Sequence, residues 1–286
     1  MSAIRVVARD RRDLLGEGPV WSARENALFW VDISGRALQR LSLVDATVTC
    51  WDVPEMIGWV IEREQAPGFI AGLESGFAEL TLEPLQIVHI VDPEPQRPRN
   101  RLNDAKADRQ GRIWAGSMPI AADRPEGALH RFDVDRRVTQ VDAGYTIANG
   151  PAFSADEKYL YHADSALRRV YRFEVQPDAT LAERIVFIEF ESGWGLPDGM
   201  TVDCEGGLWV AHWGGGRVSR FRENGTLDRS IALPASQITS CAFAGRDLDR
   251  LFVTSAAQGA EHEPHAGALF EVDTGMHGIA PNRFGG

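Results

Sequence analysis

The chain has 286 residues, of which 44% are hydrophobic, and a formal net charge of −11 at pH 7. This length allows one large domain or two ordinary ones. The charge argues against a nucleic-acid-binding protein, which needs a basic surface, and no window approaches the roughly 20 apolar residues of a membrane-spanning helix.

The N-terminal segment, residues 1–12, carries several charged side chains and no apolar stretch, so we expect no signal peptide. The three cysteines, Cys50, Cys204 and Cys241, are odd in number and lack Cys-x-x-Cys spacing. This pattern argues against a disulfide framework and against a thiolate zinc site. The sequence therefore favours a cytoplasmic protein, with neither nucleic acid nor a membrane as its partner.

Short apolar and aromatic segments recur along the chain at intervals of 40 to 48 residues. Their central residues are Trp30, Ile70, Trp114, Tyr161, Trp209 and Phe252. Polar and glycine-rich turn sequences precede several of these segments, as expected for hairpins. An alternating run follows most of them, for example Arg169-Val170-Tyr171-Arg172-Phe173, and its period of two indicates a strand.

Repeats of this length, each with about four short strands, are typical of β-propeller blades. We therefore predict an all-β protein, a six-bladed β-propeller that forms a single domain over residues 1–286 with a metal site in its central channel. Residues 4–8 are predicted to add a strand to the last blade near residues 267–272, which closes the ring and removes its open edge.

An oxygen-bearing side chain stands directly before a glycine at matching places in three repeats. The tripeptides are Glu17-Gly18-Pro19, Asn149-Gly150-Pro151 and Asp198-Gly199-Met200, and Asn103 takes a similar place in a fourth repeat. Each lies 11 to 13 residues before the central residue of its repeat. Equal offsets in a propeller predict that these side chains converge at the inner end of their blades.

Two carboxylates and amide oxygens suit Ca²⁺, Mg²⁺ or Mn²⁺ and are tolerable for Zn²⁺ or Fe²⁺. The sequence therefore predicts one divalent cation as cofactor. The alternative is that each pair is only a turn, since Asp-Gly and Asn-Gly are common turn formers. Three matched offsets favour the metal site.

Other residues near these positions have more than one interpretation. Arg101 is two residues before Asn103 and can present its guanidinium to a polyhydroxy or carboxyl substrate, or it is a surface arginine. Asp104 is expected to cap a turn rather than to orient a neighbour. Trp194 and Trp213 are expected to pack in the core rather than to form an aromatic platform for a sugar. His212 is expected to be structural rather than to touch a substrate.

Taken together, several motifs resemble the SMP-30/gluconolactonase/regucalcin-like family of six-bladed propellers. They are Leu15-Gly16-Glu17-Gly18-Pro19-Val20-Trp21, Asn100-Arg101-Leu102-Asn103-Asp104, Gly116-Ser117-Met118, Asn149-Gly150-Pro151, Pro197-Asp198-Gly199-Met200 and Gly245-Arg246-Asp247-Leu248. The resemblance covers essentially the whole chain. Two further motifs, His162-Ala163-Asp164 and Trp213-Gly214-Gly215, are closer to the bacterial sugar-lactonase branch.

This resemblance implies a divalent metal held by Glu17, Asn149 and Asp198, with Arg101 and Asn103 contacting the substrate. The chain departs from the family pattern after Met118, where relatives often carry an acidic residue and this chain has Pro119-Ile120-Ala121-Ala122. Asp123 or Glu126 is a candidate to take its place.

The sequence therefore predicts a metal-dependent lactonase that opens aldonolactones, with Asp198 as general base and a small sugar lactone as partner. We expect a monomer or a weak oligomer. Two alternatives remain: a non-catalytic calcium-binding or regulatory propeller, and a metal-dependent esterase that acts on other substrates.

Overall fold

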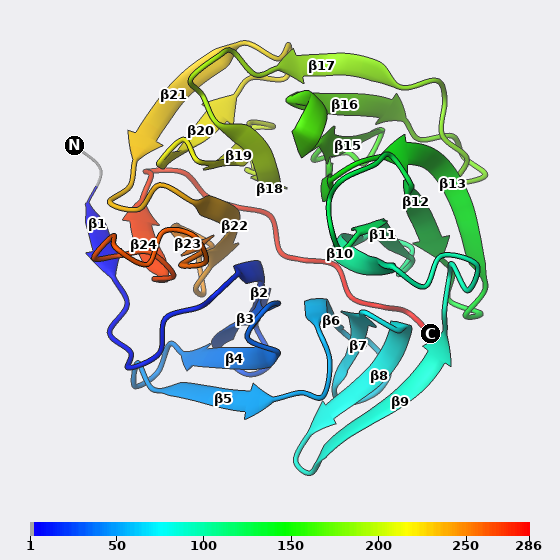
Figure 1. Ribbon diagram of the computed structural model, residues 1–286, viewed down its shortest axis with the longest axis horizontal. Coiled ribbons are helices and arrows are strands. Elements are labelled where there is room, and N and C mark those ends of the chain that lie inside the picture. Colours follow the sequence, from blue (N-terminus) through cyan, green and yellow to red (C-terminus); the bar gives the residue numbers. More distant parts are fainter. Residues whose placement is uncertain (1–2) are drawn as a thin grey trace.

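The computed structural model describes residues 3–286 as six four-stranded antiparallel sheets arranged around a central channel. Figure 1 looks along the channel, with the blades following one another around the ring in chain order. The predicted all-β, six-bladed propeller is confirmed. In each of blades 1 to 5 the first strand in the sequence is innermost.

The strand boundaries follow the predicted repeats. Blade 1 consists of β2 (Gly16–Ser22), β3 (Ala27–Asp32), β4 (Ala37–Ser42) and β5 (Val48–Asp52). Blade 2 consists of β6 (Ile57–Glu62), β7 (Phe69–Leu73), β8 (Gly76–Leu82) and β9 (Leu85–Val91). Blade 3 consists of β10 (Asn100–Ala107), β11 (Ile113–Pro119), β12 (Gly127–Phe132) and β13 (Val138–Tyr145). Blade 4 consists of β14 (Ala148–Phe153), β15 (Tyr159–Asp164), β16 (Arg169–Glu174) and β17 (Ile185–Glu189). Blade 5 consists of β18 (Leu196–Val202), β19 (Leu208–Trp213), β20 (Arg217–Phe221) and β21 (Leu227–Ala232).

Both ends of the sequence build blade 6. From the channel outward it contains β22 (Ile238–Ala244), β23 (Arg250–Ser255), β24 (Phe270–Asp273) and the N-terminal β1 (Ile4–Val6). Strand β1 pairs antiparallel with β24, and Ile4 lies opposite Val272. The predicted N-terminal closure is confirmed, and it joins the two ends of the ring through backbone hydrogen bonds.

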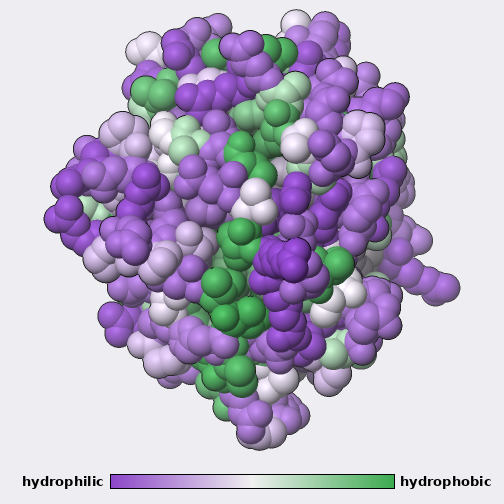
Figure 2. All heavy atoms as spheres, turned by 90° about the vertical axis from the view of Figure 1, so that its right-hand side faces the viewer, coloured by the Kyte–Doolittle hydropathy of each residue, from purple (hydrophilic) through white to green (hydrophobic). Residues whose placement is uncertain are grey.

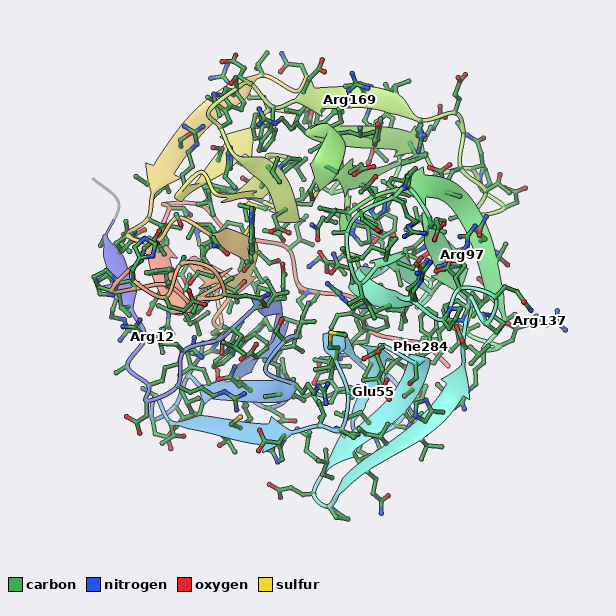
Figure 3. All side chains as sticks on the ribbon, viewed as in Figure 1. Arg12, Glu55, Arg97, Arg137, Arg169 and Phe284 are labelled. Carbon is green, nitrogen blue, oxygen red and sulfur yellow. The ribbon has the colours of Figure 1, made fainter. Side chains whose placement is uncertain are left out.

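The hydrophobic core is divided among the six contacts between neighbouring blades. Each pair of adjacent sheets shares one cluster of buried apolar side chains. The cluster between blades 2 and 3 includes Phe77, Phe132 and Phe284, and the last two rings stack with centroids 5.2 Å apart. Figure 3 labels Phe284, and Figure 1 shows the C-terminal end of the chain beside these two blades. The C-terminal segment is therefore part of the core.

Aspartates stabilise the hairpins that return the chain from the inner strand to the second strand. In blade 3, Asp108 Oδ1 accepts hydrogen bonds from the backbone N–H groups of Gln110 and Arg112, while Oδ2 accepts one from Trp114 Nε1 at 2.8 Å. Asp203 makes the matching set in blade 5, including a bond of 2.7 Å from Trp209 Nε1. One carboxylate thus fixes both the turn and the buried tryptophan of the next strand.

The outer strands face water and are more polar. Figure 2 shows one side of the ring, where hydrophilic residues predominate and hydrophobic ones form a narrow band. Cys50 and Cys204 are exposed and Cys241 is buried, and all three thiols are free. A membrane-crossing helix is not found within residues 3–286, where η1 (Ser165–Leu167) is a single 3₁₀ turn.

Candidate functional site

The four predicted oxygen donors lie on the innermost strands of four blades. Glu17 is on β2, Asn103 on β10, Asn149 on β14 and Asp198 on β18. In each of these strands the pairing with the next strand contains a register shift at or beside the donor. An extra residue on one strand bends it and re-aims its side chains. All four side chains are buried, with exposed fractions of 4 to 6%.

The glycines after three of these donors meet a geometric demand. Gly18 and Gly150 have φ angles of 54° and 67°, in the left-handed region that side chains with a Cβ seldom occupy. A Cβ at Gly199 would lie 2.1 Å from the hydroxyl of Ser240. The repeated oxygen-glycine pair is therefore a device for turning the inner strand at the channel.

All five predicted site residues line one cavity at the end of the channel where β2, β10, β14 and β18 begin, which we call the upper end. The lining residues are Leu15, Glu17, Arg101, Asn103, Met118, Ile147, Asn149, Ser165, Leu196, Asp198 and Trp213. The expectation for Trp213 was wrong, because it lines this cavity. Trp194 packs against Phe190 and Phe221, as expected for a core residue.

Arg101 and the uncharged members of the site form a directed chain of hydrogen bonds. Arg101 Nη1 donates to Asn103 Oδ1 at 2.6 Å, and Asn103 Nδ2 donates to Asn149 Oδ1 at 2.7 Å. Asn149 Nδ2 then donates to Ser165 Oγ at 2.9 Å, and this hydroxyl donates to Pro197 O at 2.6 Å. The chain connects blades 3, 4 and 5 and leaves the Asn149 oxygen at the cavity.

Glu17 and Asp198 form a buried carboxylate pair. Burial raises the pKa of Glu17 to about 8, with a further contribution from the negative charge of Asp104. Burial also raises the pKa of Asp198 well above its usual value, and the Glu17 charge adds to this shift. Both side chains line the same cavity, and the charge of Glu17 acts on Asp198, so the two carboxyl groups lie close together. Two negative charges in a dry site are costly without a cation.

These residues fit a divalent cation. Two carboxylates and the Asn149 carboxamide are hard oxygen donors, and a bound cation would offset the burial and the neighbouring negative charges that raise both pKa values. Within residues 3–286, no three His, Cys, Asp or Glu side chains come together as a metal-binding group, since the third predicted donor here is an amide. The assignment of Glu17, Asn149 and Asp198 as ligands stays a prediction.

Arg101 lines both the upper cavity and a second, polar cavity. The second cavity is lined by acidic, basic and amide side chains that include Glu55, Glu74, Asp92, Glu94, Arg97 and Asn100. Figure 3 labels Glu55, in the connection before blade 2, and Arg97, in the connection before blade 3. Burial lowers the pKa of Arg101 to about 10, which Glu17 and Glu74 oppose, so it stays charged at neutral pH. Its guanidinium can therefore meet a ligand from both cavities.

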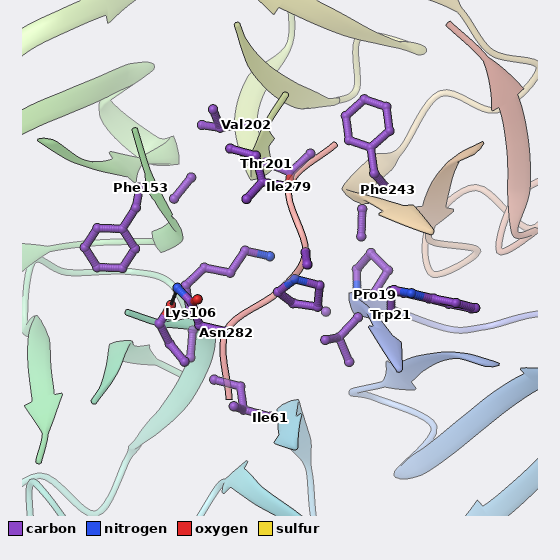
Figure 4. Close-up of a pocket in the computed structure, with 18 of the residues that line it drawn as sticks. Pro19, Trp21, Ile61, Lys106, Phe153, Thr201, Val202, Phe243, Ile279 and Asn282 are labelled. Atoms are coloured by element: carbon purple, nitrogen blue, oxygen red, sulfur yellow. Dashed lines mark hydrogen bonds between the residues drawn. The ribbon is translucent and has the colours of Figure 1, made fainter. Parts of the chain in front are cut away.

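A third cavity lies below the site and is closed by the C-terminal segment, as Figure 4 shows for Ile279 and Asn282. Lys106 reaches into this cavity, and Asp104 also lines it. The expectation that Asp104 caps a turn was wrong, because it lies within β10 at the register shift and is 6% exposed. Burial raises the pKa of Asp104, and Lys106 opposes that shift.

The acidic residues proposed to replace the one expected after Met118 point elsewhere. Asp123 and Glu126 both pair with Arg124, and their side chains are 46% and 45% exposed. Neither belongs to the lining of the upper cavity. Ile120, which occupies this part of the loop, is also exposed. The loop therefore gives the upper cavity no carboxylate.

Sequence reasoning missed the residues that hold the donors in place. Asp32, at the end of β3, accepts hydrogen bonds from the backbone of Leu14 and Leu15, just before Glu17. Asp164, at the end of β15, does the same for the two residues before the Asn149 strand. Asp32 and Asp164 are each the last residue of the second strand of their blade, so an alignment of the repeats in the sequence would have shown that they are equivalent. The structural role expected for His212 agrees with its hydrogen bond of 2.8 Å from Nδ1 to Trp194 O.

The chain is similar to known proteins over nearly its whole length. Residues 15–257 match the SMP-30/Gluconolactonase/LRE-like region. The chain is 35% identical to a 6-deoxy-6-sulfogluconolactonase of Pseudomonas putida, with 96% of each chain covered. It is 34% identical to an L-arabinolactonase of Azospirillum brasilense, over 97% of this chain and 94% of the relative.

A solved structure has the same architecture over almost its whole length. It is a calcium-binding regucalcin from Agrobacterium tumefaciens, which superposes with a TM-score of 0.92 at 27% identity and covers 99% of this chain and 97% of its own. The matched region, the identities and the coverage agree with the resemblance that the motifs indicated. This chain belongs to the SMP-30/gluconolactonase/LRE-like family.

Proposed function

We propose that this protein is a metal-dependent hydrolase that opens aldonolactones to the corresponding sugar acids. The observation that carries the proposal is the buried Glu17–Asp198 carboxylate pair, which shares one cavity with Asn149, Asn103 and Arg101. Two relatives of similar length that bear sugar-lactonase names support the choice of substrate class. A bound divalent cation would polarise the lactone carbonyl and stabilise the negative charge that develops on its oxygen.

Arg101 and Asn103 hold the sugar. Arg101 uses Nη1 for Leu102 O and Asn103 Oδ1, and its other N–H groups can donate to ring or side-chain hydroxyls. The polar cavity on its far side provides space and carboxylate acceptors for the rest of a polyhydroxy chain. These contacts place the lactone carbonyl toward Asp198.

Asp198 acts as general base. It takes a proton from the attacking water as the water oxygen bonds to the lactone carbonyl carbon. The bond from that carbon to the ring oxygen then breaks, and the proton passes to the ring oxygen, which becomes a hydroxyl group. The product acid ionises in solution, so each turnover releases one proton. A base whose pKa is raised by burial is suited to this exchange, provided that the cation keeps it ionised.

The calcium-binding alternative is supported by the name of the regucalcin structure and by the hard donor set. On that alternative the same residues bind the cation, and no lactone is hydrolysed. A metal-dependent esterase is the corresponding alternative within enzymes. The cytoplasm is our proposed compartment, supported by three free thiols of which two are exposed.

Acid release from a panel of aldonolactones tests these possibilities. Wild-type protein should hydrolyse at least one lactone, lose activity after EDTA treatment and recover it when a divalent cation is restored. Asn149→Ala and Asp198→Asn should both fail to recover. If no lactone is opened faster than in buffer with Ca²⁺, Mg²⁺, Mn²⁺ or Zn²⁺, the enzyme proposal is wrong, and full activity after EDTA treatment would refute the metal requirement.

A further inference from the structure

Ser165 connects the strands that carry two of the proposed metal ligands. It is 3% exposed and directly follows β15 in blade 4. Its Oγ accepts a hydrogen bond from Asn149 Nδ2 and donates one to Pro197 O, the residue before Asp198. The short 3₁₀ turn that begins at Ser165 does not need this hydroxyl, because Asp164 caps the turn by accepting from Ala166 N. The hydroxyl therefore serves the site.

The direction of the hydrogen bonds fixes the orientation of Asn149. A guanidinium can only donate and a backbone carbonyl can only accept. Both ends of the hydrogen-bond chain from Arg101 to Pro197 O therefore require the same direction of donation along it. The Ser165 hydroxyl hydrogen is used on Pro197 O, which leaves lone pairs that require an N–H from Asn149. Reversing the Asn149 carboxamide would place its oxygen against the Ser165 oxygen and its NH₂ against the Asn103 NH₂. Both contacts would be repulsive.

This orientation decides whether Asn149 can bind a cation, because only the oxygen end of a carboxamide is a ligand. We propose that Ser165 is a positioning residue that holds the Asn149 oxygen toward the cavity and ties it to the strand of Asp198. The inference rests on the proposed function only in taking Asn149 as a ligand of a divalent cation. Hydrogen-bonding partners of metal ligands commonly contribute 10- to 100-fold to metal affinity.

Calorimetric titration of EDTA-stripped protein with Ca²⁺, and with Mn²⁺ in parallel, tests the proposal without any substrate. Ser165→Ala should weaken cation binding by about 10-fold or more. Ser165→Thr, which keeps a hydroxyl, should retain much of the affinity. The matched control is Ser219→Ala, which removes another buried hydroxyl, one bonded to Ser230 on the outer side of blade 5. It should bind the cation like wild type.

A double-mutant cycle separates positioning from a general loss of structure. If Ser165 acts through Asn149, then Ser165→Ala should have little further effect on cation affinity in an Asn149→Ala background. Equal losses in both backgrounds would overturn the proposal, and so would wild-type affinity in Ser165→Ala. Cation binding that follows the expected pattern in a protein without lactonase activity would support the role of Ser165 and reject only the proposed enzyme function.

Discussion

The six inner strands of the propeller share one irregularity but use it in two ways. In blades 1, 3, 4 and 5 the register shift brings Glu17, Asn103, Asn149 and Asp198 to the cavity. Blades 2 and 6 have the same kind of shift at Gly58 and Thr239, and neither of these residues lines the cavity. The ring therefore offers six similar backbone positions, and the residue at each position decides whether a polar side chain reaches the cavity.

Blades 2 and 6, whose shifted residues do not reach the cavity, position their neighbours. A Cβ at Gly58 would lie 2.6 Å from the backbone oxygen of Asn103. Thr239 Oγ1 donates a hydrogen bond of 2.5 Å to the backbone oxygen of Gly16, the residue before Glu17. Blade 2 thus leaves room for the strand of blade 3 that carries Asn103, and blade 6 holds the strand of blade 1 that carries Glu17. The asymmetry of the site therefore divides the ring into two groups. Blades 1, 3, 4 and 5, which bring the predicted donors to the cavity, are the binding blades, and blades 2 and 6 are the supporting blades.

The largest expected effect is on lactone hydrolysis, and it follows from removing the charge of Asp198 in blade 5. Asp198→Asn keeps the shape of the side chain but removes a base and an anionic ligand, so kcat/KM for the best lactone should fall by roughly 10²- to 10⁴-fold. Acid release measured under saturating cation checks this, and calorimetry should show weakened cation binding. Asp135→Asn, on the exposed outer surface, is the control. Near-normal hydrolysis by Asp198→Asn would remove Asp198 from catalysis.

The second expected effect is on pH dependence, because the binding blades carry carboxyl groups with raised pKa values. The pKa of Glu17 is about 8 without a cation, so below that pH a cation must displace a proton. Apparent Ca²⁺ affinity should therefore rise by up to roughly tenfold per pH unit for each displaced proton and level off above pH 8. Titrations between pH 6 and 9 measure this slope. An affinity independent of pH over this range would contradict a protonated pair.

The same shift has a consequence for stability. A carboxyl group whose folded pKa lies above its unfolded value binds more protons in the folded state, so stability falls as pH rises between those two values. For Glu17 this window runs from about 4.5 to about 8. The unfolding midpoint of EDTA-stripped protein should therefore decrease across this window, and saturating Ca²⁺ should raise the midpoint most at its upper end.

Sequence patterns predicted the binding blades better than the supporting ones. Each proposed metal ligand precedes a glycine at a matching place in its repeat, so periodicity alone predicted that Glu17, Asn149 and Asp198 lie near one another. Ser165 carries no such signal, because its role arises from hydrogen bonds to Asn149 and to the backbone of Pro197 in the neighbouring blade. Asp104 was misjudged because a bulge, unlike a turn, leaves no clear composition signature. The loop after Met118 likewise shows its direction only in three dimensions.

A moderate effect is expected from filling the space left by a supporting blade. Gly58→Ala adds a methyl group against the backbone of Leu102 and Asn103, which cannot rotate away, so unfolding should become easier by roughly 1–3 kcal/mol. Because Asn103 would move, kcat/KM should also fall. Urea unfolding and lactone hydrolysis measure the two effects. Gly285→Ala is the control, since its nearest neighbour is the side chain of Val134 at 3.3 Å. If the two variants had equal unfolding free energies and equal kcat/KM, the proposed role of Gly58 in leaving space for the backbone of Asn103 would be wrong.

The smallest expected effect concerns the hydrogen bond from blade 6 to blade 1. Thr239→Val keeps the volume but removes the bond to Gly16 O, which should cost about 0.5–1.5 kcal/mol of unfolding free energy. Cation affinity should change only slightly, because the Glu17 carboxylate itself is untouched. Thr226→Val, which removes an exposed hydroxyl bonded to Asn224, provides the comparison. If Thr239→Val weakened cation binding as strongly as Asp198→Asn, then blade 6 would belong to the binding blades, and the division between binding and supporting blades would fail.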